Sequence, residues 1–184
     1  MKILKYTVLA LASLSLAALT YGQSSFTGFA NNPTQPVVDG ATGAPASPGI
    51  YTVGLYWGLA GTDPGSYELA ATAPVVNFGV FNNGGQPVEL PVAGGTSIQV
   101  VVKAWTGAFA SYEDALSQGT ANDWVGVSDA TNPYATAPAG SPFPNLVIQG
   151  GWTGFETVPV PEPSTVVLGL LGGLGALVLL RRRA

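Results

Sequence analysis

The sequence predicts a mostly β fold, a small antiparallel β-sandwich with one short helix, flanked by an apolar segment at each end. Two stretches, residues 51–59 and 96–105, alternate large apolar side chains with small or polar ones, and a period of two is typical of strands with one buried face. The 25 glycines and 15 prolines lie largely between such stretches, where they favour turns. Many short strands joined by turns are typical of a β-sandwich.

The chain begins with the three parts of a secretory signal peptide. Lys2 and Lys5 form a short basic region, and residues 8–19 form an apolar stretch. Thr20 and Gly22 place small side chains at the two positions that signal peptidase recognises. We predict a signal peptide over residues 1–22, which signal peptidase removes after Gly22 or, as a second choice, two residues earlier. An uncleaved anchor helix is the alternative. It is disfavoured because roughly a dozen apolar residues are fewer than the ~20 that a membrane span needs.

The body begins with strand patterns. Residues 51–59 carry their large apolar side chains at odd positions. Residues 75–81 form the next expected strand, and the Asn-Asn-Gly-Gly sequence at 82–85 predicts a hairpin turn toward a strand at 88–90, because Asn and Gly tolerate positive φ. The longest strand is expected over 96–105. Its two faces carry Ile98, Val100, Val102 and Ala104 on one side and Gln99, Val101, Lys103 and Trp105 on the other.

One helix is expected, over residues 112–118. Ser111 is suited to be its N-cap, Asp114 lies three residues later, and Gly119 is suited to end it. The remaining predicted strands are short and lie at 124–128, 145–150 and 152–158. Two stretches rich in Pro, Ala, Gly, Ser and Thr are interpreted as long surface loops, at 33–48 and 131–144.

Charge and composition exclude several classes of function. Of the six basic residues, Lys103 alone lies between residues 23 and 163, where it faces all ten carboxylates. A surface of that sign repels phosphate backbones, so no nucleic-acid partner is expected. The chain has neither Cys nor His, which excludes thiolate or imidazole metal sites and Cys or Ser-His nucleophiles. We expect no cofactor, no metal site and no enzyme activity. A carboxylate-based hydrolase is the weaker alternative, because spacing singles out no Asp or Glu pair.

The C-terminal residues contain a Pro-Glu-Pro triplet, an uncharged apolar run at 165–180 and a basic end, in that order. As a helix the run would be about 24 Å long, a marginal span of a membrane core of roughly 30 Å. The positive-inside rule places the basic end in the cytoplasm and the body outside, as the signal peptide also does. The prolines keep the chain extended. The residues singled out are the motif Pro161, Glu162 and Pro163 and the cytoplasmic stop Arg181, Arg182 and Arg183.

This arrangement resembles the PEP-CTERM protein-sorting signal of Gram-negative bacteria. The resemblance covers Val-Pro-Glu-Pro-Ser-Thr at 160–165, the Leu- and Gly-rich run and the terminal arginines. It implies recognition by an exosortase, a membrane enzyme with its own cysteine nucleophile that cuts near the motif and passes the protein to the cell surface. It also implies an association with exopolysaccharide. The predicted domains are a signal peptide at 1–22, a β-sandwich ectodomain at 23–159 and the sorting signal at 160–184.

The predicted function is that of an exported, non-enzymatic protein of the cell surface or extracellular matrix, associated with exopolysaccharide or biofilm. We expect transient anchoring in the inner membrane through residues 165–180 before release. A carbohydrate-binding module is the main alternative, since sugar rings stack on exposed aromatic faces. Trp105 and Tyr56 lie on the more polar faces of their strands and are the candidates for a glycan platform, whereas Trp57 is expected in the core. A permanent single-pass membrane protein is a further alternative.

Overall fold

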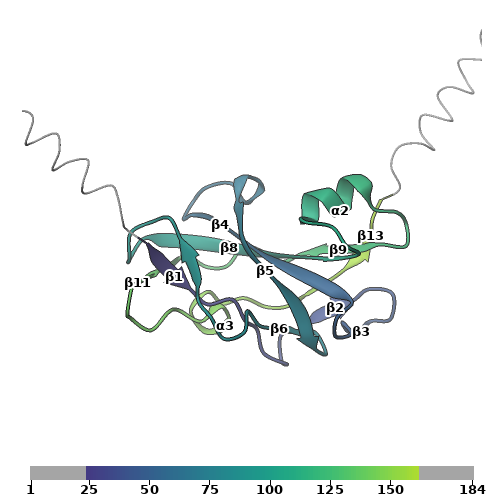
Figure 1. The fold of residues 1–184 in the computed structure, drawn as a ribbon, viewed down its shortest axis with the longest axis horizontal. Coiled ribbons are helices and arrows are strands. Elements are labelled where there is room, and N and C mark those ends of the chain that lie inside the picture. Colours follow the sequence, from purple (N-terminus) through teal and green to yellow (C-terminus); the bar gives the residue numbers. More distant parts are fainter. Residues whose placement is uncertain (1–23, 162–184) are drawn as a thin grey trace, which may run out of the picture.

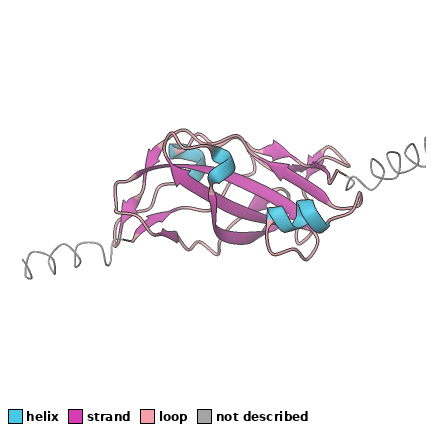
Figure 2. Ribbon diagram, turned by 90° about the horizontal axis from the view of Figure 1, so that it is seen from above, coloured by secondary structure: helices cyan, strands magenta, loops and turns pink. Residues whose placement is uncertain are grey.

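The computed structural model describes residues 24–161, in which strands dominate and the helices are short (Figure 1, Figure 2). The strands are β1 (Ser25–Thr27), β2 (Val37–Asp39), β3 (Ala44–Pro45), β4 (Tyr51–Leu59), β5 (Glu68–Asn77), β6 (Val80–Phe81), β7 (Val88–Leu90), β8 (Ser97–Thr106), β9 (Trp124–Val127), β10 (Tyr134–Ala135), β11 (Ala137–Pro138), β12 (Phe155–Glu156) and β13 (Val158–Pro159). The helices are α2 (Tyr112–Gln118), α3 (Leu146–Gln149) and the 3-10 helix η1 (Pro64–Ser66). In Figure 1 β1 and β13 lie toward opposite ends of the long axis.

One large sheet forms the middle of the body. Its strand order is β13-β9-β8-β4-β5-β6, with β10 added beside β8, and each of these pairings is antiparallel. The long strands β4 and β8 pair from Tyr51 opposite Thr106 to Leu59 opposite Ile98. The mostly β prediction with antiparallel pairing is therefore confirmed. The two longest predicted strands are confirmed as well, because a sustained period-two pattern is a strong strand signal.

Two three-stranded sheets complete the β structure. One is β11-β1-β7, and the other is β12-β2-β3, in which β12 pairs with β2 in parallel. The predicted hairpin from 75–81 to 88–90 is wrong, because β7 pairs with β1 and β6 folds back on β5 around Gly79. Gly84 and Gly85 do have positive φ, as a turn requires, but the turn leads the chain into a different sheet.

Helix α2 confirms the predicted helix over 112–118. The Ser111 hydroxyl accepts a hydrogen bond from the Asp114 N–H at 3.1 Å, and Gly119 is the C-cap. The strand predicted at 145–150 is wrong, because the segment forms α3, with the Gln149 N–H donating to the Asn145 carbonyl at 3.0 Å. A short apolar run fits either state. The two predicted loops contain the short strands β2, β3, β10 and β11.

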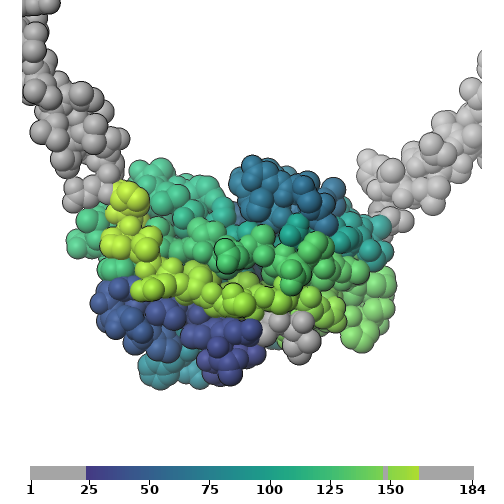
Figure 3. Space-filling view, turned by 180° about the vertical axis from the view of Figure 1, so that it is seen from behind, coloured from purple at the N-terminus to yellow at the C-terminus, as the bar shows by residue number. Residues whose placement is uncertain are grey.

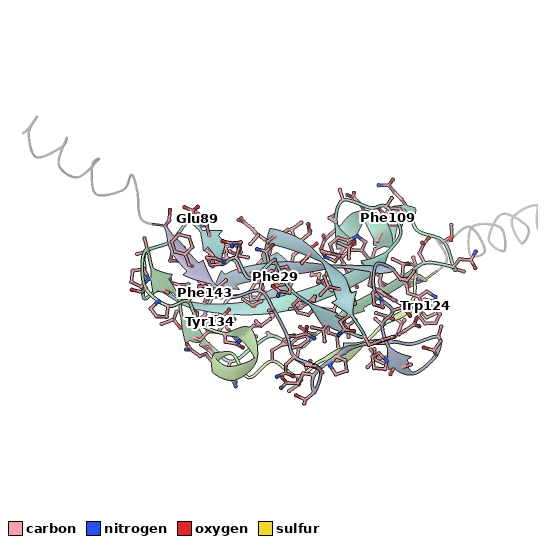
Figure 4. All side chains as sticks on the ribbon, turned by 60° about the horizontal axis from the view of Figure 1, so that its bottom comes forward. Phe29, Glu89, Phe109, Trp124, Tyr134 and Phe143 are labelled. Atoms are coloured by element: carbon pink, nitrogen blue, oxygen red, sulfur yellow. The ribbon has the colours of Figure 1, made fainter. Side chains whose placement is uncertain are left out.

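Each face of the large sheet buries its own cluster. The main cluster contains the four residues predicted on one face of β8 together with β2, β7 and an aromatic chain in which Phe81 packs against Phe29 and Trp152, with ring centroids 5.2 and 5.6 Å apart. Phe29 lies in the middle of the body in Figure 4. On the other face α2 covers what we call the second cluster, which consists of Tyr56, Tyr67, Val101, Trp105, Ala115, Val125 and Val160.

Candidate functional site

The last residues of the described chain are built into the body. We call residues 155–160 the C-terminal clamp: β12 pairs with β2 and β13 pairs with β9. Between these strands the Thr157 N–H donates to the Val38 carbonyl at 2.9 Å, and after them the Val160 N–H donates to the Asp123 carbonyl at 2.8 Å. In Figure 3 the yellow-green C-terminal band runs between purple N-terminal segments and green segments of the middle of the chain. The clamp therefore joins the β2 sheet to the large sheet.

Thr157 is the polar centre of the clamp. The residue is 1% exposed, and its hydroxyl oxygen lies 3.2 Å from the Gly40 nitrogen, which donates to it, and 3.3 Å from Tyr51 Oη. A Cβ at Gly40 would overlap the Thr157 carbonyl oxygen, so this approach requires glycine. The neighbouring Val158 is 56% exposed. The sequence did not predict the burial of Thr157, because threonine is polar. It can be buried here only because its hydroxyl and backbone N–H find hydrogen-bonding partners in the fold.

Val160 ends the clamp at the point where the predicted sorting signal begins. It is 1% exposed and belongs to the second cluster, so its packing continues the body one residue beyond the predicted boundary at 159. Pro161 is exposed. The signal peptide, the apolar run and the other residues singled out at this end lie outside the described residues: 1–22, 165–180, Glu162, Pro163, Arg181, Arg182 and Arg183. Within residues 24–161 no helix is long and apolar enough to cross a membrane.

The glycan platform expected at Trp105 and Tyr56 is wrong. Trp105 is 0% exposed and Tyr56 is 3% exposed, because α2 and the chain before it cover this face of the sheet. The Trp105 Nε1–H donates to the Phe109 carbonyl at 3.0 Å, and Figure 4 places Phe109 beside α2. The prediction failed because Gln99 and Lys103 made this face of β8 look solvent-exposed, whereas α2 packs on it. Trp57, expected in the core, is only partly buried.

A polar cluster attaches α2 to the large sheet. Lys103 is the only basic residue within 24–161, and its Nζ lies 2.6 Å from Glu113 Oε1 and 3.9 Å from the centre of the Tyr56 ring. Tyr56 Oη donates to Glu113 Oε2 at 2.7 Å and accepts from the Tyr112 N–H at 3.2 Å. Burial raises the pKa of Tyr56, and the hydrogen bond to Glu113 raises it further. The charges of Lys103 and Glu113 neutralise each other within the cluster, which suits a structural role.

Glu113 should make stability depend on pH. Its partial burial alone would raise the pKa, but hydrogen bonds from Lys103 and Tyr56 outweigh it, so the pKa lies below its usual value of 4.5. The ionised form therefore stabilises the fold above about pH 4.5, and this contribution is lost as the pH falls through the lowered folded pKa. Because Glu113 is 56% exposed, we expect no more than about 1 kcal/mol.

Urea unfolding of the wild type and of Glu113→Gln at pH 3 and pH 6 measures this dependence. The remaining carboxylates are common to both proteins, so the wild type should lose more stability than the variant on acidification. Equal losses in the two proteins would contradict the role given to Glu113.

A shallow hollow of about 220 Å³ lies where β4 meets the loop that leads into β5. The partly buried Trp57 lines it together with exposed polar side chains of Thr62, Ser66 and Glu68. Trp57 and Glu68 are opposite one another in the β4–β5 pairing. An aromatic face beside hydroxyls and a carboxylate can stack on a sugar ring and bind its hydroxyls. A second hollow of about 380 Å³ is lined by Lys103, whose charge Glu113 already neutralises.

Residues 159–184 match the family model of the PEP-CTERM protein-sorting motif. The chain carries a PEP-CTERM sorting motif. The matched segment begins at Pro159, the last residue of β13, so the PEP-CTERM motif overlaps the C-terminal clamp by two residues. Comparisons with curated proteins and with solved structures found no match.

The PEP-CTERM motif confirms the family resemblance inferred from the residues. It implies sorting by an exosortase, with export and passage through a membrane before the protein reaches the surface. Of the motif residues singled out, Pro161 is exposed at the exit of the clamp, and the individual roles of Pro161, Glu162 and Pro163 in sorting stay predictions. The structure adds what the motif alone does not reveal, namely that the signal follows the folded body without a spacer.

Proposed function

We propose that this protein is an exported, non-enzymatic component of the cell surface or extracellular matrix. Signal peptidase removes residues 1–22, the run at 165–180 anchors the chain transiently in the inner membrane, and exosortase processing then releases the body. The observation that carries the proposal is the match over 159–184, in which triplet, apolar run and arginines occur in order. An association with exopolysaccharide or biofilm is the part of the proposal that rests on the resemblance alone.

Two features support a non-enzymatic body. The chain has no Cys or His, so the commonest nucleophiles and bases are missing. A carboxylate general acid needs a raised pKa to stay protonated near neutral pH, whereas the partners of Glu113 lower its pKa. The alternative of a carboxylate hydrolase predicts turnover that is lost when one particular Asp or Glu is neutralised.

Mass spectrometry of both ends of the mature chain from native cells tests the proposal. We expect the exported form to lack residues 1–22 and the terminal arginines. A variant with Pro161, Glu162 and Pro163 all replaced by alanine should keep the arginines and accumulate in the membrane fraction, because the processing motif is gone. An exported wild-type chain that still ends in Arg181–Arg183 and Ala184 would refute processing, and a full-length chain held in the membrane would favour the permanent single-pass alternative.

Glycan binding is a second candidate function, favoured by the hollow at Trp57. If a sugar ring stacks there, Trp57→Ala should weaken retention on exopolysaccharide from the native cells roughly five- to tenfold, as expected for the loss of one aromatic stacking contact. Phe78→Ala is the matched control, because Phe78 is 65% exposed and does not line the hollow. Equal retention of wild type, Trp57→Ala and Phe78→Ala would remove this hollow from consideration.

A further inference from the structure

The C-terminal clamp places the sorting motif directly against the folded body. Three successive attachments precede Pro161: β12 pairs with β2, Thr157 is buried between the two sheets, and Val160 is buried in the second cluster. The Val160 N–H is already bonded to the Asp123 carbonyl, and β13 is already paired with β9. Val158 and Pro159 of β13 are exposed, but their backbone is held in the sheet by the pairing with β9, so Pro161 is the first exposed residue beyond the clamp.

A processing enzyme must bind the scissile peptide bond in an accessible, extended segment. Its catalytic residues have to reach the scissile carbonyl, and its binding cleft has to contact the backbone on both sides. Within the clamp this would require β13 to leave β9 and Val160 to leave its apolar surroundings. Releasing Thr157 would in addition leave the Gly40 N–H and the Val38 carbonyl without their present partners. The peptide bonds from Phe155 to Val160 are therefore closed to processing while the body is folded.

We infer that the C-terminal clamp sets the N-terminal limit of the exosortase cut, so that the mature chain ends at or beyond Pro161 and keeps Val160 in its core. The inference rests on the proposed function, since it presupposes that processing occurs. Val160 is then a positioning residue for the reaction. The enzyme does not recognise its side chain. The packing of Val160 keeps the preceding peptide bonds inaccessible, so that the motif is the first accessible segment.

Limited proteolysis of the full-length chain in detergent tests the clamp without an exosortase. Proteinase K is suitable because it cuts most accessible extended segments. The matched pair is Val160→Asp and Val158→Asp, the same substitution two residues apart, with the first side chain 1% and the second 56% exposed. We expect wild type and Val158→Asp to be cut on the C-terminal side of Val160, and Val160→Asp to be cut within 155–160 at least tenfold faster than either.

Cutting of the wild type within 155–160 as fast as in Val160→Asp would overturn the inference. If Val160→Asp does not accumulate, Val160→Ala takes its place, with the same direction and a smaller increase in rate.

The mature C-terminus from native cells supplies the second arm. A last residue at Pro161 or later supports the inference, whereas a processed chain ending at or before Val160 overturns it while leaving the proposed function standing. The opposite case is equally distinct: an exported chain with an intact arginine end refutes the proposed function, and proteolysis still decides whether the clamp is closed. In Val160→Asp we expect additional mature species that end inside the clamp, which Val158→Asp should lack.

Discussion

Replacing Trp105 with alanine should destabilise the body by about 3–5 kcal/mol, the usual cost of emptying a fully buried aromatic site. Trp105 is 0% exposed and lies on β8 between Thr52 of β4 and Val125 of β9 in the strand pairing. Its ring fills the space under α2, and its Nε1–H donates to the Phe109 carbonyl at 3.0 Å. The substitution removes the packing and the donor together, so α2 should detach before the sheet melts.

Urea unfolding followed by circular dichroism gives the measurement. Trp57→Ala is the control, because it removes the same side chain from a partly buried position on β4 and should cost less than half as much. An unchanged unfolding midpoint for Trp105→Ala would mean that the ring is not packed, and it would restore Trp105 as a surface candidate.

The contrast between these tryptophans shows where sequence reasoning ends. The period-two pattern correctly separated the two faces of β8, because Ile98 and Val100 are both fully buried in the main cluster. It failed on the other face, where Gln99 and Lys103 suggested solvent. Helix α2, whose own bounds were predicted correctly from its cap, packs on that face. Local signals define an element, whereas its partner is decided by tertiary contacts that no local pattern contains.

The C-terminal clamp was harder to predict for a different reason. Its two strands are two residues long, too short for any periodicity, and hydrophobicity is inverted along it, since Thr157 is buried and Val158 is exposed. The buried threonine makes sense only beside Gly40, which lies more than a hundred residues earlier in the chain. By contrast, the sorting motif was predictable because its three parts are consecutive in sequence and each has its own composition.

Gly79→Ala should also destabilise the body strongly, by roughly 2–4 kcal/mol from backbone strain and overpacking together. Gly79 has φ +66°, a conformation that side chains other than glycine's disfavour, and a Cβ there would lie 2.5 Å from Pro36 Cβ and 2.6 Å from the Val37 carbonyl oxygen. Its N–H donates to the Ala46 carbonyl, and its carbonyl accepts from the Val37 N–H and from Asn31 Nδ2 at 2.9 Å each. The clash would therefore loosen the contact between the β5–β6 turn and β2.

Gly84→Ala separates the two causes. Gly84 has nearly the same backbone angle, φ +63°, but a Cβ there would meet nothing within 4 Å, so its substitution should cost only the strain, about 1–2 kcal/mol. Thermal unfolding of both variants measures the difference in destabilisation, which is the part caused by the steric overlap with Pro36 and Val37. Equal losses would show that backbone strain alone matters at Gly79. A larger loss at Gly79 would show that the turn is held by contact with the N-terminal segment, the same segment that β12 pairs with at the start of the C-terminal clamp.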